Sequence, residues 1–211
     1  MLLIAGMLYF SSLCGQCGPA VEPSTSLAII KVESGGNPYA IGDNTERKSY
    51  APRSKEEAVT VASKLLAQGH NIDMGLMQIN SIHLRPMKLS LDEVFDPCRN
   101  IKAGSTILAD FYRRNDRPGE DKITVLYKAL SAYNTGSAWR GPGYINKILQ
   151  AAGVGYRVAL NGSAPKADSR RKAEKPKKEA KRQGQNSLSL TGDGSSLFCE
   201  GTGGGGGKPG I

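Results

Sequence analysis

Apolar residues recur three and four positions apart in successive segments of this chain from residue 54 onward. This spacing puts the apolar residues of a segment on one face of a helix, the face that a globular protein buries. The stripes consist of Ala58, Val61, Ala62, Leu65 and Leu66; Ile101, Gly104, Ile107, Leu108 and Phe111; Ile123, Leu126, Ala129, Leu130 and Tyr133; and Tyr144, Ile145, Ile148 and Leu149. We therefore expect a mainly α fold, a compact domain in which these faces pack together.

Capping signals precede several of these helices. Ser54 stands three residues before Glu57, and Ser90 three before Glu93, which is the spacing of a capping box. Pro97 suits a first helical position, where its missing N–H would have no partner. These signals predict helices that begin near residues 55, 91 and 97.

Two longer stretches, residues 37–53 and 69–84, lack helical periodicity. We expect them to form short strands or irregular loops that line a cleft. The whole helical part, about 145 residues in about five helices, is long enough to bury roughly two thirds of its unfolded surface, which suffices for a self-standing core.

A short helix is predicted at residues 24–33, before a glycine pair. The side-chain oxygens of residues 24–26 offer caps for its first N–H groups. Gly35 or Gly36 can adopt the left-handed conformation that ends a helix, and Pro38 prevents its continuation.

Glu33 is the ionisable group at the end of this helix. It shares a face with Ile29 and Ile30, which lie four and three positions earlier. Burial and the partial negative charge of a helix C-terminus would both raise the pKa of its carboxyl above about 4.3. A carboxyl with a raised pKa can protonate a leaving group at neutral pH. The alternative from helical geometry alone is a terminal glutamate that points into water.

The first 13 residues are apolar apart from Ser11 and Ser12. This run is too short for a membrane span of about 20 residues, but it fits the apolar centre of a signal peptide. We expect residues 1–16 to be an export signal, cleaved between Ser12 and Gln16, with no transmembrane span in the mature chain. Its usual basic start is absent, so we expect the true start upstream. The alternative is a buried helix of the domain.

Four cysteines allow three pairings if all are retained. Cys14 and Cys17 have the spacing of a redox pair, but no βαβ pattern surrounds them. Cys17 stands before the first helix of the domain and Cys98 at the start of a later one. In an oxidising compartment a Cys17–Cys98 bridge would close a long loop and add a few kcal/mol of stability. Cys199 would then be odd and exposed.

The composition changes after the helical part. Residues 1–162 hold 18 basic and 14 acidic residues, whereas residues 163–211 hold 10 and 5. We expect residues 161–211 to be a disordered tail, basic at first and then rich in Gly and Ser, because they lack the apolar residues of a core. A basic tail can bind nucleic acid, membrane or anionic wall polymers. Without interleaved aromatic residues, we expect a solvated tail with no specific nucleic-acid partner.

Three short runs stand at element boundaries and carry the polar groups of a sugar-binding cleft. They are Glu-Ser-Gly-Gly-Asn-Pro at 33–38, Gly-Leu-Met-Gln-Ile-Asn at 75–80 and Ala-Tyr-Asn-Thr-Gly at 132–136. An acid, amides and a phenol can hydrogen-bond sugar hydroxyl and N-acetyl groups and orient the acid. Individually each run is weak evidence, since a loop glutamine is usually solvated and a tyrosine on a helical stripe is usually core.

Together and in this order, the runs resemble those of the lytic transglycosylase family, which has a goose-type lysozyme-like fold. The chain is most similar to the small transglycosylases of type IV secretion and conjugation systems. That likeness rests on the Cys-Gly-Pro at 17–19, the Pro-Tyr-Ala-Ile-Gly at 38–42 and the Pro-Cys at 97–98. It covers about residues 17–155 of an expected domain at 17–160. The chain departs from the general family in a long segment between the first two runs.

The resemblance implies that Glu33 is the catalytic acid and base. It would protonate the oxygen of the β-1,4 bond between N-acetylmuramic acid and N-acetylglucosamine. It would then deprotonate the muramoyl 6-hydroxyl, whose attack gives a 1,6-anhydro end. Asp43 and Asp73 are the nearest other carboxylates, and neither falls in a matched catalytic position. The N-acetyl group of the substrate could take the role of a second carboxylate.

The resemblance also implies the supporting residues. Met77 and Gln78 would line the glycan subsites, and Tyr133 would hydrogen-bond near the acid. Asn134 would support the cleft, and Ser34 would help to position the acid.

The implied location is the periplasm, and the implied partners are peptidoglycan glycan strands and other components of an envelope-spanning secretion or conjugation complex. With His70 and His83 as the only histidines, we expect no metal site, and we expect no cofactor. Three alternatives stay open. The first is a muramidase that uses Glu33 with water as the nucleophile, and the second is a non-catalytic peptidoglycan-binding assembly module. The third is nucleic-acid binding through the tail, which would disappear on removal of residues 163–211.

Overall fold

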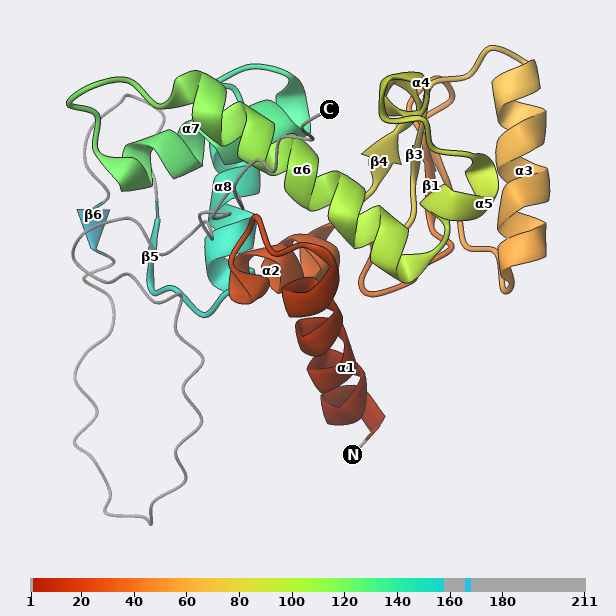
Figure 1. The fold of residues 1–211 in the computed structure, drawn as a ribbon, viewed down its shortest axis with the longest axis horizontal. Coiled ribbons are helices and arrows are strands. Elements are labelled where there is room, and N and C mark those ends of the chain that lie inside the picture. The colour runs from red at the N-terminus through yellow and green to blue at the C-terminus, as the bar shows by residue number, and fades with distance from the viewer. Residues whose placement is uncertain (1, 158–165, 168–211) are drawn as a thin grey trace, which may run out of the picture.

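The computed structural model describes residues 2–157 and 166–167 of the 211-residue chain (Figure 1). The expectations for the tail, including its disorder and the state of Cys199, lie outside the described residues. The helices are α1 (Leu2–Cys17), α2 (Pro23–Glu33), α3 (Lys55–Ala67), α4 (Leu84–Met87), α5 (Leu91–Val94), α6 (Pro97–Asn115), α7 (Lys122–Thr135) and α8 (Pro142–Ala151), with a 3-10 turn, η1 (Ser81–His83). The mainly α fold predicted from the stripes is confirmed.

The two stretches without helical periodicity form a small sheet. Its strands are β1 (Ile41–Asp43), β2 (Lys48–Tyr50), β3 (Ile72–Met74) and β4 (Ile79–Asn80), in the antiparallel order β2-β1-β3-β4. A separate pair, β5 (Tyr156–Arg157) and β6 (Lys166–Ala167), follows α8. In the larger sheet Ile41, Ile72, Met74 and Ile79 are buried. The intervening residues of β1 and β3 point to the opposite face, because side chains alternate along a strand.

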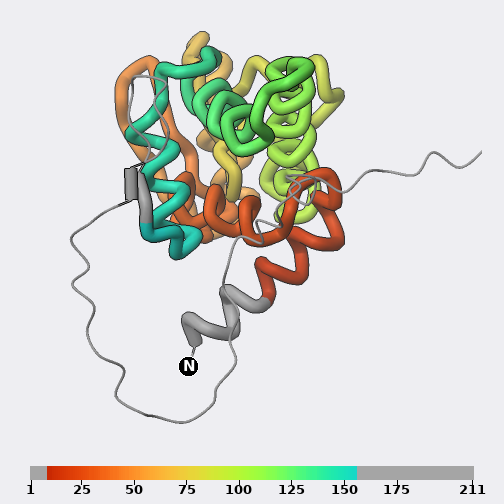
Figure 2. Tube along the Cα trace, turned by 90° about the vertical axis from the view of Figure 1, so that its left-hand side faces the viewer, coloured from red at the N-terminus to blue at the C-terminus, as the bar shows by residue number. Residues whose placement is uncertain are grey.

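Helix α6 runs through the middle of the molecule, with α7 and α8 on one side and the sheet and α3 on the other (Figure 1). Helices α1 and α2 lie at the lower edge of the body in both views, and α1 projects downward from it (Figure 1 and Figure 2). Helix α1 contacts α6, and α2 contacts α8. The core follows the predicted stripes: Ile101 and Leu108 of α6, Leu130 of α7 and Ile148 of α8 are almost fully buried.

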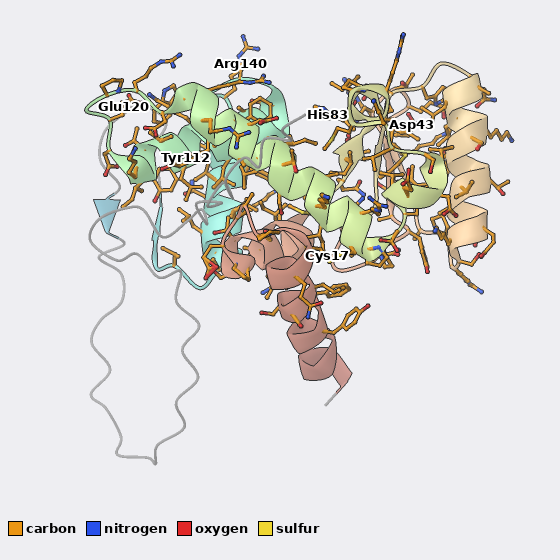
Figure 3. The ribbon with its side chains drawn as sticks, in the orientation of Figure 1. Cys17, Asp43, His83, Tyr112, Glu120 and Arg140 are labelled. Atoms are coloured by element: carbon orange, nitrogen blue, oxygen red, sulfur yellow. A yellow bond between two sulfur atoms is a disulfide. The ribbon has the colours of Figure 1, made fainter. Side chains whose placement is uncertain are left out.

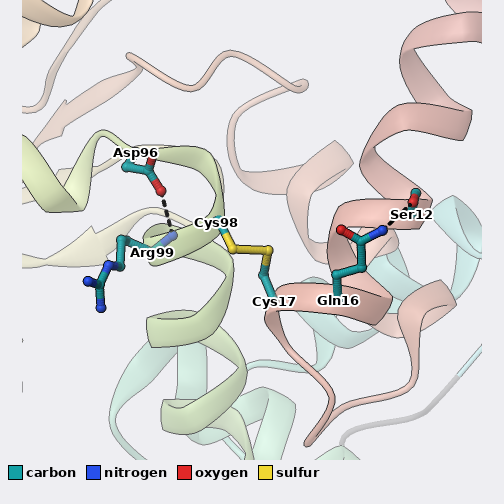
Figure 4. The surroundings of a disulfide bond; sticks show 6 residues. All are labelled: Ser12, Gln16, Cys17, Asp96, Cys98 and Arg99. Carbon is teal, nitrogen blue, oxygen red and sulfur yellow. Dashed lines mark hydrogen bonds between the residues drawn. A yellow bond between two sulfur atoms is a disulfide. The ribbon is translucent and has the colours of Figure 1, made fainter.

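The predicted Cys17–Cys98 disulfide is confirmed, and it joins the end of α1 to the first turn of α6 (Figure 4). It spans 81 positions of sequence. Asp96 caps the same turn by accepting a hydrogen bond from the Arg99 N–H at 2.9 Å. The disulfide and the cap together fix the start of the longest helix among those described.

The last turns of α1 pack on the domain, with the Cys14 side chain fully buried and its thiol free. Within the described residues, no helix is both long and apolar enough to span a bilayer. The removal of residues 1–16 as a signal stays a prediction, which N-terminal sequencing of the exported protein would test.

Helix starts agree with the capping signals at most points. Ser90 and Glu93 form the full capping box, and Pro97 occupies the first turn of α6. Ser54 caps α3 through the Glu57 N–H. The capping box is incomplete there, because the Glu57 carboxylate accepts from the N–H of residue 53 instead of the Ser54 N–H.

The predicted cap of α2 is wrong. The helix begins at Pro23, and its N-cap residue, Glu22, makes no side-chain cap hydrogen bond. Within the described residues, the hydroxyls of Ser24, Thr25 and Ser26 are buried without a hydrogen-bond partner. Because Pro23 takes the first position, these three residues lie inside the helix and its packing rather than before it. The predicted end is confirmed, since the two glycines after Ser34 both have positive φ.

Candidate active site

A cavity of about 450 Å³ is lined by residues of the sheet and its loops on one side and of α6 and α7 on the other, and Glu33 lies on its wall. The sheet side carries mainly amide and acid groups, whereas the helix side is apolar with polar groups at one end. The lining residues of the sheet side are Asn44, Asn71, Asp73, Gln78, Ile79, Asn80, Ile82 and His83; those of the helix side are Ile107, Phe111, Ala132, Tyr133, Asn134, Thr135 and Gly136. Figure 3 places His83 on the sheet side of α6.

Glu33 is brought to this cavity by the end of α2. The helix packs Ile29 and Ile30 into the core, and the chain then turns away through Gly35 and Gly36. The face that buries the isoleucines therefore leaves the carboxyl of Glu33 half-buried at the cavity wall.

Burial raises the pKa of Glu33 to about 7. A hydrogen bond from Tyr144 lowers this pKa in part, the negative charge of Asp73 adds to the rise, and the positive charge of Lys147 opposes it. The expected upward shift is therefore present. With a pKa near the ambient pH, roughly half of the carboxyls carry a proton at pH 7, which suits a group that must both give and take one.

Tyr144 is the site residue that sequence analysis missed. Its phenol donates a 2.6 Å hydrogen bond to Oε1 of Glu33, and only 7% of the residue is exposed. Burial and the negative charge of Glu33 raise the pKa of Tyr144, so the phenol remains a donor. The available signal was a phenol within an aliphatic stripe, because a buried tyrosine hydroxyl usually needs a partner.

Tyr133 was expected to hydrogen-bond near the acid, and its phenol donates to the Met77 carbonyl at 2.8 Å. It lies on the cavity wall beside Glu33. Burial raises the pKa of Tyr133, and the negative charge of Glu33 raises it further. Tyr133 thus joins the end of α7 to the Gly75–Gln78 turn, while Tyr144 is the direct partner of Glu33.

Ser34 connects the acid to that same turn. Its hydroxyl donates to the Leu76 carbonyl at 2.8 Å and accepts from the Gly36 N–H at 3.2 Å. The side chain does not line the cavity. A positioning role for Ser34 agrees with these contacts.

Asn100 of α6, which sequence analysis did not single out, holds the turn from beneath. It is buried, accepts from the Met77 N–H at 2.8 Å, and donates to the carbonyls of Met74 and Val94 at 2.9 and 2.7 Å. The signal was an asparagine beside the apolar stripe of a helix, where a buried amide must find partners.

Gln78 lines the cavity, as expected of a residue that contacts glycan. Its backbone has a φ of 48°, an uncommon conformation for a residue with a side chain. Its amide nitrogen donates to the carbonyls of Ala40 and Gly75 at 3.1 and 2.8 Å. These bonds use both N–H groups, so its side-chain oxygen is the atom that remains to accept a hydrogen bond from a ligand.

Met77 is placed differently from the expectation that it lines the glycan subsites. Its side chain is fully buried and lies against Gly104 of α6. A Cβ on Gly104 would stand 2.5 Å from the Met77 sulfur, so the methionine needs a glycine at that position. In this arrangement its carbonyl supports Tyr133 and its side chain supports α6. Asn134, by contrast, lies exposed at the cavity rim.

Asp43 and Asp73 occupy different surroundings. Asp43 is buried and accepts from the N–H groups of Thr45 and Glu46 and from His70. Burial alone would raise the pKa of Asp43, but these hydrogen bonds together hold it below the usual value. Asp43 is therefore part of the turn after β1 and does not line the cavity. Asp73 does line it.

Comparison with known proteins identifies a family whose model matches this chain. The family model described as "Transglycosylase SLT domain" matches residues 12–141. A protein of Brucella abortus biovar 1 (strain 9-941) named "Type IV secretion system protein virB1" is 40% identical over 157 residues, which cover 70% of this chain and 66% of the relative. "Protein virB1" of Agrobacterium fabrum (strain C58 / ATCC 33970) is 34% identical over 145 residues, 68% of this chain and 59% of the relative.

A third relative, named "Peptidoglycan-binding-like protein" in Escherichia coli O157:H7, is 30% identical over 146 residues, which cover 65% of this chain and 72% of the relative. The matched part of the chain spans just under two thirds of the length of the Brucella relative. The family match includes the three runs around Glu33, Gln78 and Tyr133, although it ends at residue 141, before Tyr144.

Proposed function

The chain belongs to the family of transglycosylase SLT domains, and from that premise we propose that it is a peptidoglycan lytic transglycosylase. The bond cleaved is the β-1,4 linkage between N-acetylmuramic acid and N-acetylglucosamine. The observation that carries the proposal is the half-buried carboxyl of Glu33, with a pKa of about 7, on the wall of a 450 Å³ cavity. A carboxyl so placed can act as general acid and then as general base.

In the first step the protonated Glu33 gives its proton to the glycosidic oxygen. The bond from that oxygen to the muramoyl anomeric carbon breaks, N-acetylglucosamine leaves with a hydroxyl group, and positive charge develops at the anomeric carbon. Tyr144 keeps the carboxyl in place through its 2.6 Å hydrogen bond and stabilises the carboxylate that forms.

In the second step the Glu33 carboxylate takes the proton of the muramoyl 6-hydroxyl. The freed oxygen bonds to the anomeric carbon and closes a 1,6-anhydro ring, which leaves Glu33 protonated as at the start. No water is consumed. The apolar wall of Ile107, Phe111 and Ala132 supports this outcome, because it limits water beside the reacting sugar.

The two walls of the cavity suit a glycan strand. Sugar hydroxyl and N-acetyl groups would face the amides of the sheet side and the free oxygen of Gln78. The less polar sugar faces and the lactyl group would face the side chains of α6 and Ala132. Asn134 would contact the strand at the rim.

The cellular role follows from the relatives named virB1 rather than from the site. We propose that the chain is exported to the periplasm, where it opens the wall locally for a type IV secretion or conjugation apparatus. Other components of that apparatus would be its protein partners. The test is the Glu33→Gln variant in the living cell: loss of secretion or conjugation supports the role, and normal transfer would favour a non-catalytic assembly module.

Product analysis tests the chemistry. Purified sacculi are digested with the native protein and with Glu33→Gln, and the soluble fragments are examined by mass spectrometry. We expect 1,6-anhydro ends from the native protein and no release by the variant. Reducing ends would instead identify a muramidase that uses the same acid. Equal release by both proteins would overturn the role of Glu33.

A further inference from the structure

The loop between α7 and α8 begins at the rim of the cavity. Asn134, Thr135 and Gly136, where α7 ends and the loop starts, line the cavity. Three residues further on, the loop carries Trp139, the only tryptophan of the chain. Trp139 is one of three exposed large hydrophobic residues in the described part of the chain, with 37% of the residue accessible. The two-step reaction above gives this side chain no task.

The backbone of Trp139 has an unfavourable conformation. Its φ is 73°, in the left-handed region that is costly for a residue with a side chain. Within the described residues, four residues other than glycine have a positive φ, and another of them is Gln78, which lines the cavity. Such strain persists only where the surrounding contacts impose it, and it often marks a binding site.

Ser131 of α7 holds the loop on both sides of Trp139. Its hydroxyl is fully buried and donates to the Ser137 carbonyl at 2.8 Å. The same hydroxyl accepts hydrogen bonds from the N–H groups of Arg140 and Gly141, at 2.9 and 3.0 Å. The backbone before and after Trp139 is therefore fixed, and the exposed indole ring is attached to a loop with a defined conformation.

The indole ring lies over the face of α7 that also reaches the cavity. The Lys128 ammonium stands 5.6 Å from the ring centroid and is itself paired with Glu120. Lys128 lies four positions before Ala132, which lines the cavity, so the two share one face of α7. The cation covers one side of the ring, and the exposed part of the residue remains open to a ligand.

A polymer that binds in the cavity must continue over the surface beside it, because a cavity of about 450 Å³ has the size that holds a drug-sized ligand. The loop of Trp139 is the part of that surface next to the α7 end of the cavity. Figure 3 places Arg140, the residue after Trp139, along the same upper side of the molecule as His83, which lines the cavity from the sheet side.

We propose that Trp139 is a sugar-binding platform, on which a saccharide unit of the glycan strand stacks where the strand leaves the cavity at the end of α7. This inference rests on the proposed function, since it concerns the same substrate. The less polar face of a pyranose ring presents C–H groups, whose partial positive charge suits the negative face of an aromatic ring. Trp139 adds binding for strands long enough to reach it and takes no part in bond cleavage.

The first test changes the ring in two ways in the full-length protein. Trp139→Gly removes the aromatic face and places a glycine where φ is positive, so the backbone itself is relieved of strain. Trp139→Tyr keeps an aromatic face and is the matched control. On long, soluble, uncrosslinked glycan strands, we expect Trp139→Gly to raise KM about tenfold with little change in kcat, and Trp139→Tyr to stay within about threefold of the native KM. The effect of Trp139→Gly on KM should shrink as the strands are shortened.

A second measurement needs neither turnover nor a change at position 139. Because Trp139 is the only tryptophan of the chain, tryptophan fluorescence reports on this loop alone. The Glu33→Gln variant is titrated with the long strands and, separately, with a disaccharide fragment. We expect the long strands to shift the emission to shorter wavelength, because a stacked sugar removes water from the ring, and the disaccharide to shift it much less. This measurement decides the matter even if Trp139→Gly fails to fold, as judged by thermal unfolding.

The outcomes separate this inference from the proposed function. The platform is overturned if Trp139→Gly keeps the KM for long strands within about twofold of the native value, or if strands at about ten times the native KM leave the emission of Glu33→Gln unchanged. A lower melting temperature with an unchanged KM would show that Trp139 only supports the packing around Lys128. If the native protein releases no glycan while long strands still shift the emission, the platform stands and the proposed function fails.

Discussion

The phenol of Tyr144 and the carboxyl of Glu33 meet across 111 positions of sequence, in a 2.6 Å hydrogen bond between α8 and the end of α2. The contact is possible because α8 packs directly on α2. It makes the position and the protonation of the acid depend on a helix that carries none of the three sequence runs.

Removal of the Tyr144 hydroxyl should shift the pH dependence of activity upward. The hydrogen bond favours the charged form of Glu33 and lowers its pKa, so Tyr144→Phe should raise that pKa. We expect the alkaline limb of the pH–rate profile to rise by about half to one unit, with a lower kcat because the carboxyl loses its orientation. Tyr50→Phe, on β2 and outside the cavity lining, is the control. An unmoved limb in Tyr144→Phe would contradict the assignment.

The raised pKa of Glu33 also makes stability depend on pH. With a value of about 7 against 4.5 ordinarily, the folded chain binds this proton more tightly than the unfolded chain. The contribution is fully present below about pH 4.5 and is lost as the pH rises through about 7. The free energy of unfolding of Glu33→Gln, taken relative to that of the native protein, should therefore rise by about 2 to 3 kcal/mol from about pH 4 to about pH 8. Urea unfolding at both pH values checks this, and parallel pH dependence of the two proteins would refute it.

Loss of the Asn100 side chain should loosen the turn that carries Gln78. Asn100→Ala removes three buried hydrogen bonds and leaves the Met77 N–H and two carbonyls without this partner. We expect the free energy of unfolding to fall by about 2 to 4 kcal/mol. Thr106→Ala, an exposed position on the same helix, should change it by less than about 0.5 kcal/mol. Equal unfolding midpoints for the two variants would show that the turn is held by other contacts.

A side chain at position 104 should disturb the packing of α6 on the same turn. The Cβ of Gly104→Ala would meet the Met77 side chain at 2.5 to 2.8 Å, whereas that of Gly143→Ala on α8 meets nothing within 4 Å. We expect the first variant to lose about 1 to 3 kcal/mol, despite the better helix propensity of alanine. The second should be unchanged or slightly more stable. Calorimetric unfolding of both proteins compares them, and similar melting temperatures would contradict the close packing.

The Cys17–Cys98 bridge should contribute about 4 kcal/mol, because it closes a loop of 81 positions in the unfolded chain. The double variant Cys17→Ser, Cys98→Ser should lose this amount in urea unfolding under oxidising conditions. A reducing agent should bring the native protein to the stability of the double variant and leave the variant itself unchanged. A native protein that is insensitive to the reducing agent would mean that the bridge adds little.

Much of the fold could be predicted because the buried faces of α3, α6, α7 and α8 correspond to apolar residues spaced three and four positions apart in the sequence. The starts of α5 at Ser90 and of α6 at Pro97 were also predictable, since their caps use residues close in sequence. The start of α2 was not. Ser24, Thr25 and Ser26 have capping side chains, but Pro23 moves the first turn ahead of them and the packing buries their hydroxyls.

The site was predictable in part for a related reason. Glu33 and Gln78 stand at element boundaries, where a polar group among apolar neighbours is conspicuous. Tyr144 reaches Glu33 through a contact between distant segments, and its one local signal is a phenol within an aliphatic stripe. The Asp73 carboxylate likewise accepts hydrogen bonds from residues distant in sequence, namely Asn44, which follows β1, and Asn80 of β4.

Helix α6 supports both sides of the cavity with one rigid rod. Asn100 and Gly104 hold the turn that bears Gln78, and Ile107 and Phe111 form the facing wall. At 1.5 Å per residue, about 16 Å of continuous helix sets the distance from the first of these anchors to the last. Because both walls of the cavity rest on the same helix, we expect the distance between them to stay the same when a glycan strand binds. Binding should therefore not require the two walls to close on the strand.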